Sequence, residues 1–431
     1  MLDKFTQWIE KYLGGPMASI ANQRHLRAVR DGIIAALPLI IVGSFFMIIA
    51  FPPLPESWGV TQFLTANAET ILLPYRMSMY IMALYATFGI GASLSKSYDL
   101  DQVAGGILAV TAFLLTLVPV SIPEEATEIA GVEGFVLPMA NLGGEGMFVG
   151  IVTSIIAVEI YRLTDKSNFK ITMPEQVPPA VARSFEALTP TLIVILLIGS
   201  ITYYIGFDWH AFIGNLISPL ISAADSLPSV LLLVLLTTFF WFFGIHGLAV
   251  IGSIARPLWL QLLENNSSAL AAGEPLPTIG AEPFYQWFIW IGGAGATIGL
   301  AILLAFRAKS QYGSKLGKTI LAPAIFNINE PIIFGVPIVL NPILMVPFIG
   351  APIVLATIAW FATKLGLVNA VTVTAPWTLP GPIGAFLATN GDWRAAVLNV
   401  VLIIIAILIY YPFFKVYDKN ELAKEQGTIE K

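Results

Sequence analysis

Two ionisable side chains lie in long stretches of sequence that are otherwise uncharged. His246 lies in the string WFFGIHG, residues 241–247, and Glu330 lies in FNINEPIIFG, residues 326–335. An ionisable group at membrane depth is costly if it faces lipid, so it faces protein or a water-filled cavity. An imidazole and a carboxylate can orient a hydroxyl group and exchange a proton with it. These two residues are therefore the first candidates for a functional site.

Each candidate has a simpler alternative. His246 could be a core histidine satisfied by a backbone carbonyl, and Glu330 could cap a loop in water. The apolar run around His246 and the glycines on either side of it favour a polar cavity. The two asparagines just before Glu330 place several donors and acceptors at one point, which suits a ligand covered in hydroxyl groups.

Tryptophan and small residues extend this candidate site. Trp377 lies in a third uncharged stretch, residues 365–391, where it could stack on the apolar face of a sugar or belong to an interfacial belt. Trp241 precedes His246 by one helical turn and a residue. The predicted substrate-binding residues are Trp241, His246, Gly247, Asn327, Asn329, Glu330 and Trp377, of which His246 and Glu330 are also predicted to take part in the chemistry.

Prolines and glycines interrupt the helices that carry these residues. Six prolines lie at 323, 331, 337, 342, 347 and 352, and a second proline-rich and glycine-rich string covers 374–385. Proline removes a helix donor and disfavours helix at the residue before it. Broken backbone at membrane depth is tolerated where it lines a cavity, and transporters build midplane sites from such elements. We therefore expect broken helices, read as re-entrant hairpins, at about 321–335 and 375–391.

The composition indicates that this chain is surrounded partly by lipid. Of its 431 residues, 57% are hydrophobic and only 11% are charged, with a mean hydropathy of +0.80. Roughly 25% charged residues is usual for soluble domains, so lipid must be part of the solvent here. This excludes a soluble enzyme, a nucleic-acid binder and a disordered scaffold. The lack of cysteine excludes disulfides and thiolate chemistry, no metal-ligand spacing is present, and no cofactor is predicted.

The apolar runs predict an all-α integral membrane protein with about ten transmembrane helices in two domains. The runs lie near 32–51, 71–94, 102–120, 143–162, 190–206, 229–250, 284–305, 338–363 and 394–414. The basic segment 1–30 and the basic tail should be cytoplasmic, and the acidic loop at 124–133 should lie outside. In the second half, the basic residues after the run 284–305 would lie outside the cell. An additional full or partial crossing between about 246 and 283 would return them to the cytoplasmic side. The glycine-rich stripe 292–299 indicates close helix packing.

A polar, proline-containing linker separates the two halves. It covers residues 164–189. The predicted organisation is an N-terminal membrane domain at 1–163, this cytoplasmic or interfacial linker, a C-terminal transport domain at 190–415, and a cytoplasmic tail at 416–431.

Three strings in the chain resemble a known family. They are MPEQVPPAVARSF at 173–185, FGIHG at 243–247 and FNINEPIIFG at 326–335. They are similar to the membrane IIC component of the bacterial phosphoenolpyruvate-dependent sugar phosphotransferase system. The branch is the lactose/cellobiose/diacetylchitobiose family, with the diacetylchitobiose-type carriers the most similar group. The resemblance covers essentially the whole chain.

The resemblance implies a function and a set of partners. Such carriers are homodimers in the bacterial cell membrane, with an N-terminal dimerising domain and a C-terminal substrate domain that contains two re-entrant hairpins. They carry a β-linked disaccharide whose C6 hydroxyl lies near the residues that match His246 and Glu330. The phosphoryl donor is a phosphocysteine on the IIB protein, itself supplied by IIA. This chain has no cysteine, so the resemblance implies a separate IIB polypeptide and no phosphorylated residue here.

Composition alone leaves two other functions open. One is an ion-coupled sugar symporter with Glu330 as its proton site. The other is a membrane receptor that binds sugar without moving it. The family resemblance favours the phosphotransferase carrier over both.

Overall fold

The computed structural model describes residues 23–427, except 53, 56, 123–133, 168, 170, 172, 175, 178–184, 337 and 340. Most of the basic N-terminal segment and the acidic loop at 124–133 therefore lie outside the described residues, as does part of the linker. The chain divides into two compact units. The N-terminal unit contains Asn22–Gly43 and Leu73–Leu220, and the C-terminal unit contains Ser44–Leu72 and the chain from Ile221 onward.

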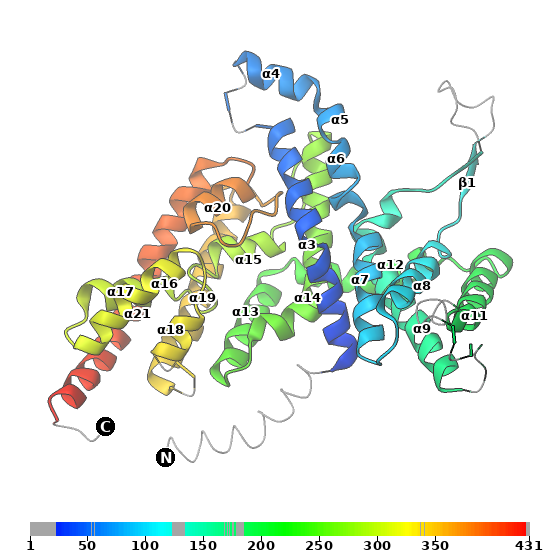
Figure 1. The fold of residues 1–431 in the computed structure, drawn as a ribbon. Helices are drawn as coiled ribbons and strands as arrows, with labels where there is room; N and C mark the ends of the chain where they lie inside the picture. Colours follow the sequence, from blue (N-terminus) through cyan, green and yellow to red (C-terminus); the bar gives the residue numbers. More distant parts are fainter. Residues whose placement is uncertain are drawn as a thin grey trace. The chain divides into compact units, whose positions relative to one another are not determined.

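In the described part of the N-terminal unit, the regular structure is helical apart from one short hairpin (Figure 1). Its strands β1 (Val120–Ile122) and β2 (Gly134–Val136) pair antiparallel, with Val120 opposite Val136. Its other elements are α6 (Leu73–Arg76), η2 (Met79–Ile81), α7 (Met82–Lys96), α8 (Gln102–Leu114), η4 (Ala140–Leu142), η5 (Gly144–Gly146), α9 (Met147–Lys166), α11 (Leu188–Gly199) and the π-helical turn η6 (Ser200–Tyr204). Helices α3 (Arg24–Ala50) and α12 (Trp209–Ala224) cross the division between the units.

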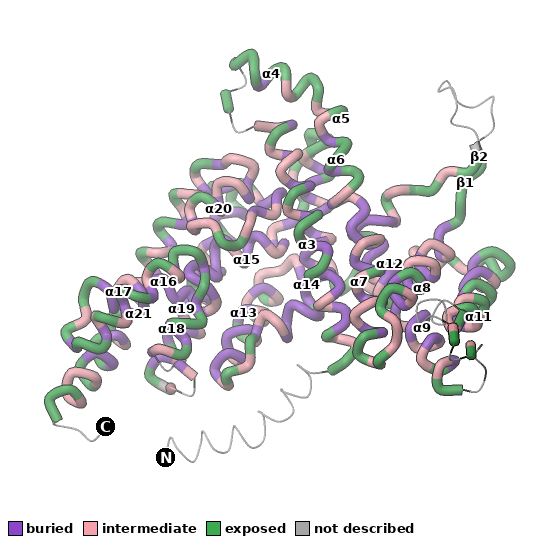
Figure 2. Tube along the Cα trace, in the orientation of Figure 1, coloured by how far each residue is buried: buried purple, intermediate pink, exposed green. Residues whose placement is uncertain are grey.

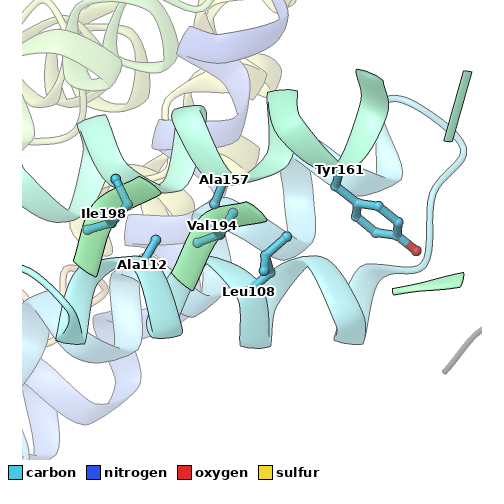
Figure 3. Close-up of a cluster of buried hydrophobic side chains, with 6 residues drawn as sticks. All are labelled: Leu108, Ala112, Ala157, Tyr161, Val194 and Ile198. Carbon is cyan, nitrogen blue, oxygen red and sulfur yellow. The ribbon is translucent and has the colours of Figure 1, made fainter. Parts of the chain in front are cut away.

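The core of the N-terminal unit joins three of its helices. Leu108 and Ala112 of α8, Ala157 and Tyr161 of α9, and Val194 and Ile198 of α11 form one buried cluster (Figure 3). Small residues let helix backbones approach closely, which is the usual way membrane helices associate. Helix α11 therefore belongs structurally with α8 and α9, although the sequence analysis assigned residues from 190 onward to the C-terminal domain.

The C-terminal unit carries most of the broken helices. It contains α4 (Gly59–Ala66), α5 (Ala68–Ile71), α13 (Leu227–Phe242), α14 (Gly247–Ala272), α15 (Glu282–Phe288), α16 (Ile298–Arg307), α17 (Gln311–Ile325), α18 (Glu330–Gly335), α19 (Pro342–Lys364), α20 (Gly381–Ala388) and α21 (Trp393–Glu425). The long helix α21 packs against α16, α19 and α20, while α13 packs against α14 and α19.

Side-chain caps define where several of these helices begin. The caps are Ser226 for α13, Ser310 for α17, Asn341 for α19 and Asp392 for α21, and each accepts a hydrogen bond from a backbone N–H in the first turn. Such a cap satisfies one of the donors that a helix start leaves unpaired. The starts of these four helices are therefore set locally by the sequence.

Five helices among the described residues are long and apolar enough to cross a membrane. They are Arg24–Ala50, Leu73–Lys96, Gly144–Lys166, Ile343–Lys364 and Trp393–Glu425. A sixth span would be the pair Leu188–Tyr204 and Trp209–Ala224, which is bent by 86°. The chain is thus a multi-span helical protein, and the larger number of about ten spans stays a prediction.

The structure changes the helix assignments in two places. The run predicted at 229–250 is two helices, α13 and α14, and the run predicted at 284–305 is also two, α15 and α16. Residues 289–297 between the latter form turns with left-handed backbone at Gly292, Gly293, Gly295 and Ala296. The helix-packing interpretation of the glycine stripe is therefore wrong for residues 292–296 and holds for Gly299 of α16, which lies against the backbone of α21.

Helix α14 occupies the interval in which an additional crossing was predicted. The hydropathy runs did not include it, because its polar residues lower the mean hydropathy. Two of these residues form hydrogen bonds inside the protein. Arg256 forms a bidentate ion pair with Glu282 at 2.8–3.2 Å, and Asn266 donates to the carbonyls of Thr278 and Val371. Much of this helix is buried (Figure 2).

Candidate functional site

The turn between α13 and α14 places His246. Helix α13 ends in a Schellman motif, in which Gly244 donates to the Trp241 carbonyl at 2.9 Å and Ile245 donates to the Phe240 carbonyl at 3.1 Å. Gly244 has φ +73°, a conformation that glycine adopts without steric penalty. The chain then reverses into α14, for which His246 is the N-cap. We call residues 243–246 the histidine turn.

The break between α17 and α18 has the same backbone motif. Asn327 donates its N–H to the Ala324 carbonyl at 3.1 Å, and Ile328 donates to the Pro323 carbonyl at 3.0 Å. Asn327 occupies the left-handed position, with φ +61°. Three residues after Asn327, α18 begins at Glu330. We call residues 326–329 the asparagine turn; it confirms that the helix breaks within 321–335.

The two turns bring His246 and Glu330 together. The distance from His246 Nε2 to Glu330 Oε1 is 3.9 Å, and their side chains are 50% and 48% exposed. This is longer than a hydrogen bond, so a hydroxyl group between them can contact both. Their exposure and closeness favour a shared ligand site over a buried core histidine or an isolated surface carboxylate.

The hydrogen bonding of His246 selects its tautomer. Its Nδ1 atom accepts the backbone N–H of Ala249 at 3.1 Å. A nitrogen that accepts a hydrogen bond carries no proton, so the neutral ring carries its proton on Nε2. Nε2 is the atom nearer Glu330. The ring therefore presents a donor and the carboxylate presents acceptors toward the same point.

Trp241 and Gly247 support His246 from within the protein. The Trp241 and His246 rings lie 4.5 Å apart, centroid to centroid, with a 46° tilt. Trp241 is buried, so it forms a wall behind the imidazole. A Cβ at Gly247 would overlap the Thr237 carbonyl, so only glycine lets α14 begin this close to α13.

Asn327 joins three segments of the C-terminal unit. Its amide nitrogen donates to the carbonyls of Trp377 and Leu379 at 2.8 and 3.0 Å, and its oxygen accepts the Gly292 N–H at 2.9 Å. Both donors and the oxygen are therefore occupied by backbone groups. These contacts tie the asparagine turn to Gly292 and to residues 377–379.

Asn329 has a similar arrangement. It is buried and donates to the Ala294 carbonyl at 2.7 Å. Residues 289–297 thus hold both asparagines, and the sequence analysis missed this loop as part of the site. Three glycines within four residues, at 292, 293 and 295, were the signal that could have identified it.

Trp377 is connected to the asparagine turn through its backbone carbonyl. Its carbonyl accepts from Asn327, while its side chain is 52% exposed. The string that contains it is non-helical up to Pro380, after which α20 begins, so a break within 375–391 is confirmed. An exposed indole held near the asparagine turn is available to stack on a ligand.

The site offers donors, acceptors and an aromatic face, and no metal-binding cluster. Within the described ranges, no group of three or more His, Cys, Asp or Glu residues could hold a metal ion. The arrangement suits a neutral polyhydroxylated ligand that is oriented by hydrogen bonds.

Comparison with known proteins identifies the family. A family model described as "Phosphotransferase system, EIIC" matches residues 30–352. The chain is similar to the "Lichenan permease IIC component" of Bacillus subtilis (strain 168), with 38% identity over 443 residues that cover 100% of this chain and 97% of that protein. It is also similar to the "PTS system cellobiose-specific EIIC component" of Geobacillus stearothermophilus, with 39% identity over 439 residues, 99% of this chain and 97% of that protein.

A solved structure shares the whole fold. The crystal structure of the transporter ChbC, the IIC component from the N,N'-diacetylchitobiose-specific phosphotransferase system, matches with a TM-score of 0.89 and 36% identity. The match covers 97% of this chain and 99% of that one. The apolar helices, the paired helix breaks and this match define a multi-span membrane transporter. The chain belongs to the EIIC family of the phosphotransferase system, which confirms the resemblance found in the sequence.

Proposed function

We propose that this protein carries a β-linked disaccharide of the cellobiose or diacetylchitobiose class across the bacterial cell membrane and presents its C6 hydroxyl for phosphorylation. The observation that supports this most directly is the pair His246 and Glu330, half exposed and 3.9 Å apart at two helix breaks. The names of its relatives, which include cellobiose and diacetylchitobiose carriers, support the sugar class.

The pair has complementary tasks in the proposed reaction. The C6 oxygen attacks phosphorus, a P–O bond forms, and the bond from phosphorus to the IIB cysteine sulfur breaks, with the electron pair leaving on the thiolate. The hydroxyl proton passes to the Glu330 carboxylate, while His246 Nε2 donates to the same hydroxyl. Phosphoryl transfer depends mainly on alignment and charge placement, so holding the oxygen in line matters more than the strength of the base.

The remaining site residues divide by role. Trp377 stacks on a sugar ring, and Trp241 and Gly247 fix the histidine from behind. Asn327 and Asn329, predicted as sugar ligands, also hold the loops of the site, since their described hydrogen bonds go to backbone carbonyls and an N–H.

The phosphoryl donor is a separate phosphorylated IIB protein, with IIA upstream of it. Exposed basic side chains surround the α16–α17 loop and the end of α21; they are Arg307, Lys309, Lys315, Lys318, Lys415 and Lys419. Two carboxylates among them, Asp418 and Glu425, accept hydrogen bonds from backbone N–H groups of residues 309–312. This basic face suits a negatively charged phosphoprotein.

The wider architecture is proposed to follow the family. The protein is a homodimer with cytoplasmic termini, dimerising through its N-terminal domain, and it moves sugar by alternating access of the C-terminal domain. The helix breaks at 326–329 and before α20 are then the tips of re-entrant hairpins. The functional domains proposed are those predicted from the sequence, 1–163, 164–189, 190–415 and 416–431, although α11 packs with α8 and α9 of the N-terminal unit.

The decisive experiment is sugar uptake into vesicles that contain the purified protein. We expect uptake of labelled cellobiose or diacetylchitobiose, recovered as the 6-phosphate, only when phosphorylated IIB is enclosed. Accumulation of unmodified sugar driven by a proton gradient without IIB would establish the symporter instead. Binding without depletion of external sugar under both conditions would establish a receptor.

A further inference from the structure

One hydrogen bond connects the basic face to the helix that carries Glu330. The Tyr312 hydroxyl, in the first turn of α17, donates to the carbonyl oxygen of Gly335 at 2.7 Å. Gly335 is the last residue of α18, and Glu330 is the first. The two ends of this helix are only about 8 Å apart, at 1.5 Å rise per residue.

Helix α18 is too short to be rigid by itself. It has six residues, fewer than two turns, whereas isolated helices of less than about 12 residues are marginal. Its final carbonyls have no partner within the helix and require one elsewhere. Ile332 and Ile333 bury one side of it, and Asn329 holds its start to the Ala294 carbonyl. Tyr312 supplies a matching contact at its end.

Tyr312 is itself held in place by α21. The backbone N–H groups of Gln311 and Tyr312 donate to the Glu425 carboxylate at 3.0 and 2.7 Å. Just before them, the Lys309 and Ser310 N–H groups donate to the Asp418 carboxylate at 2.8 and 3.0 Å. The base of the tyrosine is therefore fixed to a long helix, and its hydroxyl reaches across to α18.

We propose that Tyr312 is a positioning residue that holds Glu330 in the orientation needed to bind the sugar hydroxyl. The proposal rests on the site assigned above and adds a residue that contacts neither sugar nor phosphate. Loss of the Tyr312 contact leaves the end of α18 unheld, and a tilt of this six-residue helix moves the Glu330 carboxylate relative to His246, because Glu330 is its first residue.

The alternative is a surface tyrosine whose hydroxyl has no functional consequence. Tyr312→Phe removes only the oxygen atom. Tyr417→Phe is the matched control, since the Tyr417 hydroxyl is buried on neighbouring α21 and makes no hydrogen bond within the described part of the chain. Both variants are checked for wild-type yield and a single symmetric size-exclusion peak before binding is measured.

The test is a double-mutant cycle with Glu330→Gln, measured by equilibrium binding of cellobiose and diacetylchitobiose. We expect Tyr312→Phe to weaken binding of the preferred sugar by about 2- to 12-fold, the range of a net hydrogen bond. In the Glu330→Gln background the same change should weaken binding by less than about 2-fold, because the group it positions has lost its charge. Tyr417→Phe should leave binding unchanged in both backgrounds.

Each other outcome overturns a specific statement. Equal losses from Tyr312→Phe in both backgrounds would show a general structural effect and overturn the positioning role. No loss in either background would also overturn it. A wild-type protein that binds neither sugar, or a Glu330→Gln variant that binds normally, would overturn the proposed function itself and is recognised before Tyr312 is changed.

Discussion

The histidine turn and the asparagine turn have the same backbone hydrogen bonds but are stabilised differently. Each ends a helix in a Schellman motif and is followed by an ionisable residue. His246 lies two positions after the left-handed residue of its turn, and Glu330 lies three positions after that of the other. The left-handed residue is Gly244 in one turn and Asn327 in the other. Glycine contributes conformational freedom alone, whereas the asparagine side chain also makes three hydrogen bonds to distant backbone.

The difference shows how each site residue is held. His246 is fixed by its own helix, through the Ala249 N–H, and by the Trp241 ring. Glu330 makes no comparable cap and starts a six-residue helix, so its position depends on the loops that Asn327 and Asn329 hold. His246 is held by contacts within its own turn and helices, whereas Glu330 is held by contacts between segments that are distant in sequence. Variants in the asparagine turn should therefore have larger effects than variants in the histidine turn.

The largest effect should come from Asn327→Gly. Glycine tolerates the left-handed backbone, so the turn itself can form, but the Gly292 N–H and the carbonyls of Trp377 and Leu379 lose their partner. Unpaired buried groups cost about 1–3 kcal/mol each, so we expect a loss of about 3 kcal/mol or more. If that free energy must be recovered to form the turn in the sugar-bound state, sugar binding falls by about 100-fold. Thermal unfolding and equilibrium binding of the purified protein measure both, and near-normal values would mean that the asparagine turn is held by its backbone alone.

Glu330→Gln should have the next largest effect and should leave folding intact. A hydrogen bond to a charged group is worth about 1.5–3 kcal/mol, so binding should weaken by about 10- to 150-fold. If Glu330 also accepts the hydroxyl proton, single-turnover phosphorylation by phospho-IIB should fall further than binding does. Equal losses would limit the carboxylate to orientation, and wild-type values for both would place the site elsewhere.

Changes at His246 separate its two contacts. His246→Asn keeps a residue that caps helices well but removes the Nε2 donor, and His246→Ala removes both. Both should weaken sugar binding by about 2- to 12-fold, the value of a neutral hydrogen bond. Only the alanine variant should also lower thermal stability, by the roughly 0.5–2 kcal/mol of a cap. Equal stability of the two variants would contradict the capping contribution of Nδ1.

The smallest effect should come from Gly244→Asn, which gives the histidine turn the residue found in the asparagine turn. Asparagine adopts left-handed backbone more readily than other side chains, and a Cβ at this position meets only Val339 Cγ1, at 3.5 Å. Binding should stay within about 2-fold of wild type, while Gly244→Val should lose about 1–2 kcal/mol of stability. A large loss on Gly244→Asn would show that the two turns are not interchangeable in backbone.

Much of the helical organisation could be predicted from the sequence, and the errors have clear causes. The breaks at prolines and the long apolar spans followed from local chemistry. The hydropathy runs missed helix α14 because Arg256 and Asn266 lower its hydropathy, although their partners, Glu282 and Thr278, satisfy them; the charge distribution alone indicated an additional element there. The loop at 289–297 was missed because a glycine stripe fits helix packing as well as left-handed turns.

The sequence by itself determined that the chain is a helical membrane protein, that its family is the EIIC family, and that His246 and Glu330 are the ionisable groups to consider. The cost of a charge in an apolar run is a local property, so the residues alone reveal it. Only the tertiary structure decided that the two groups meet, and that Asn327 and Asn329 turn toward backbone. Hydrogen-bond partners far apart in the chain are chosen by packing, because each buried polar group pairs with whichever neighbour the folded helices bring within reach.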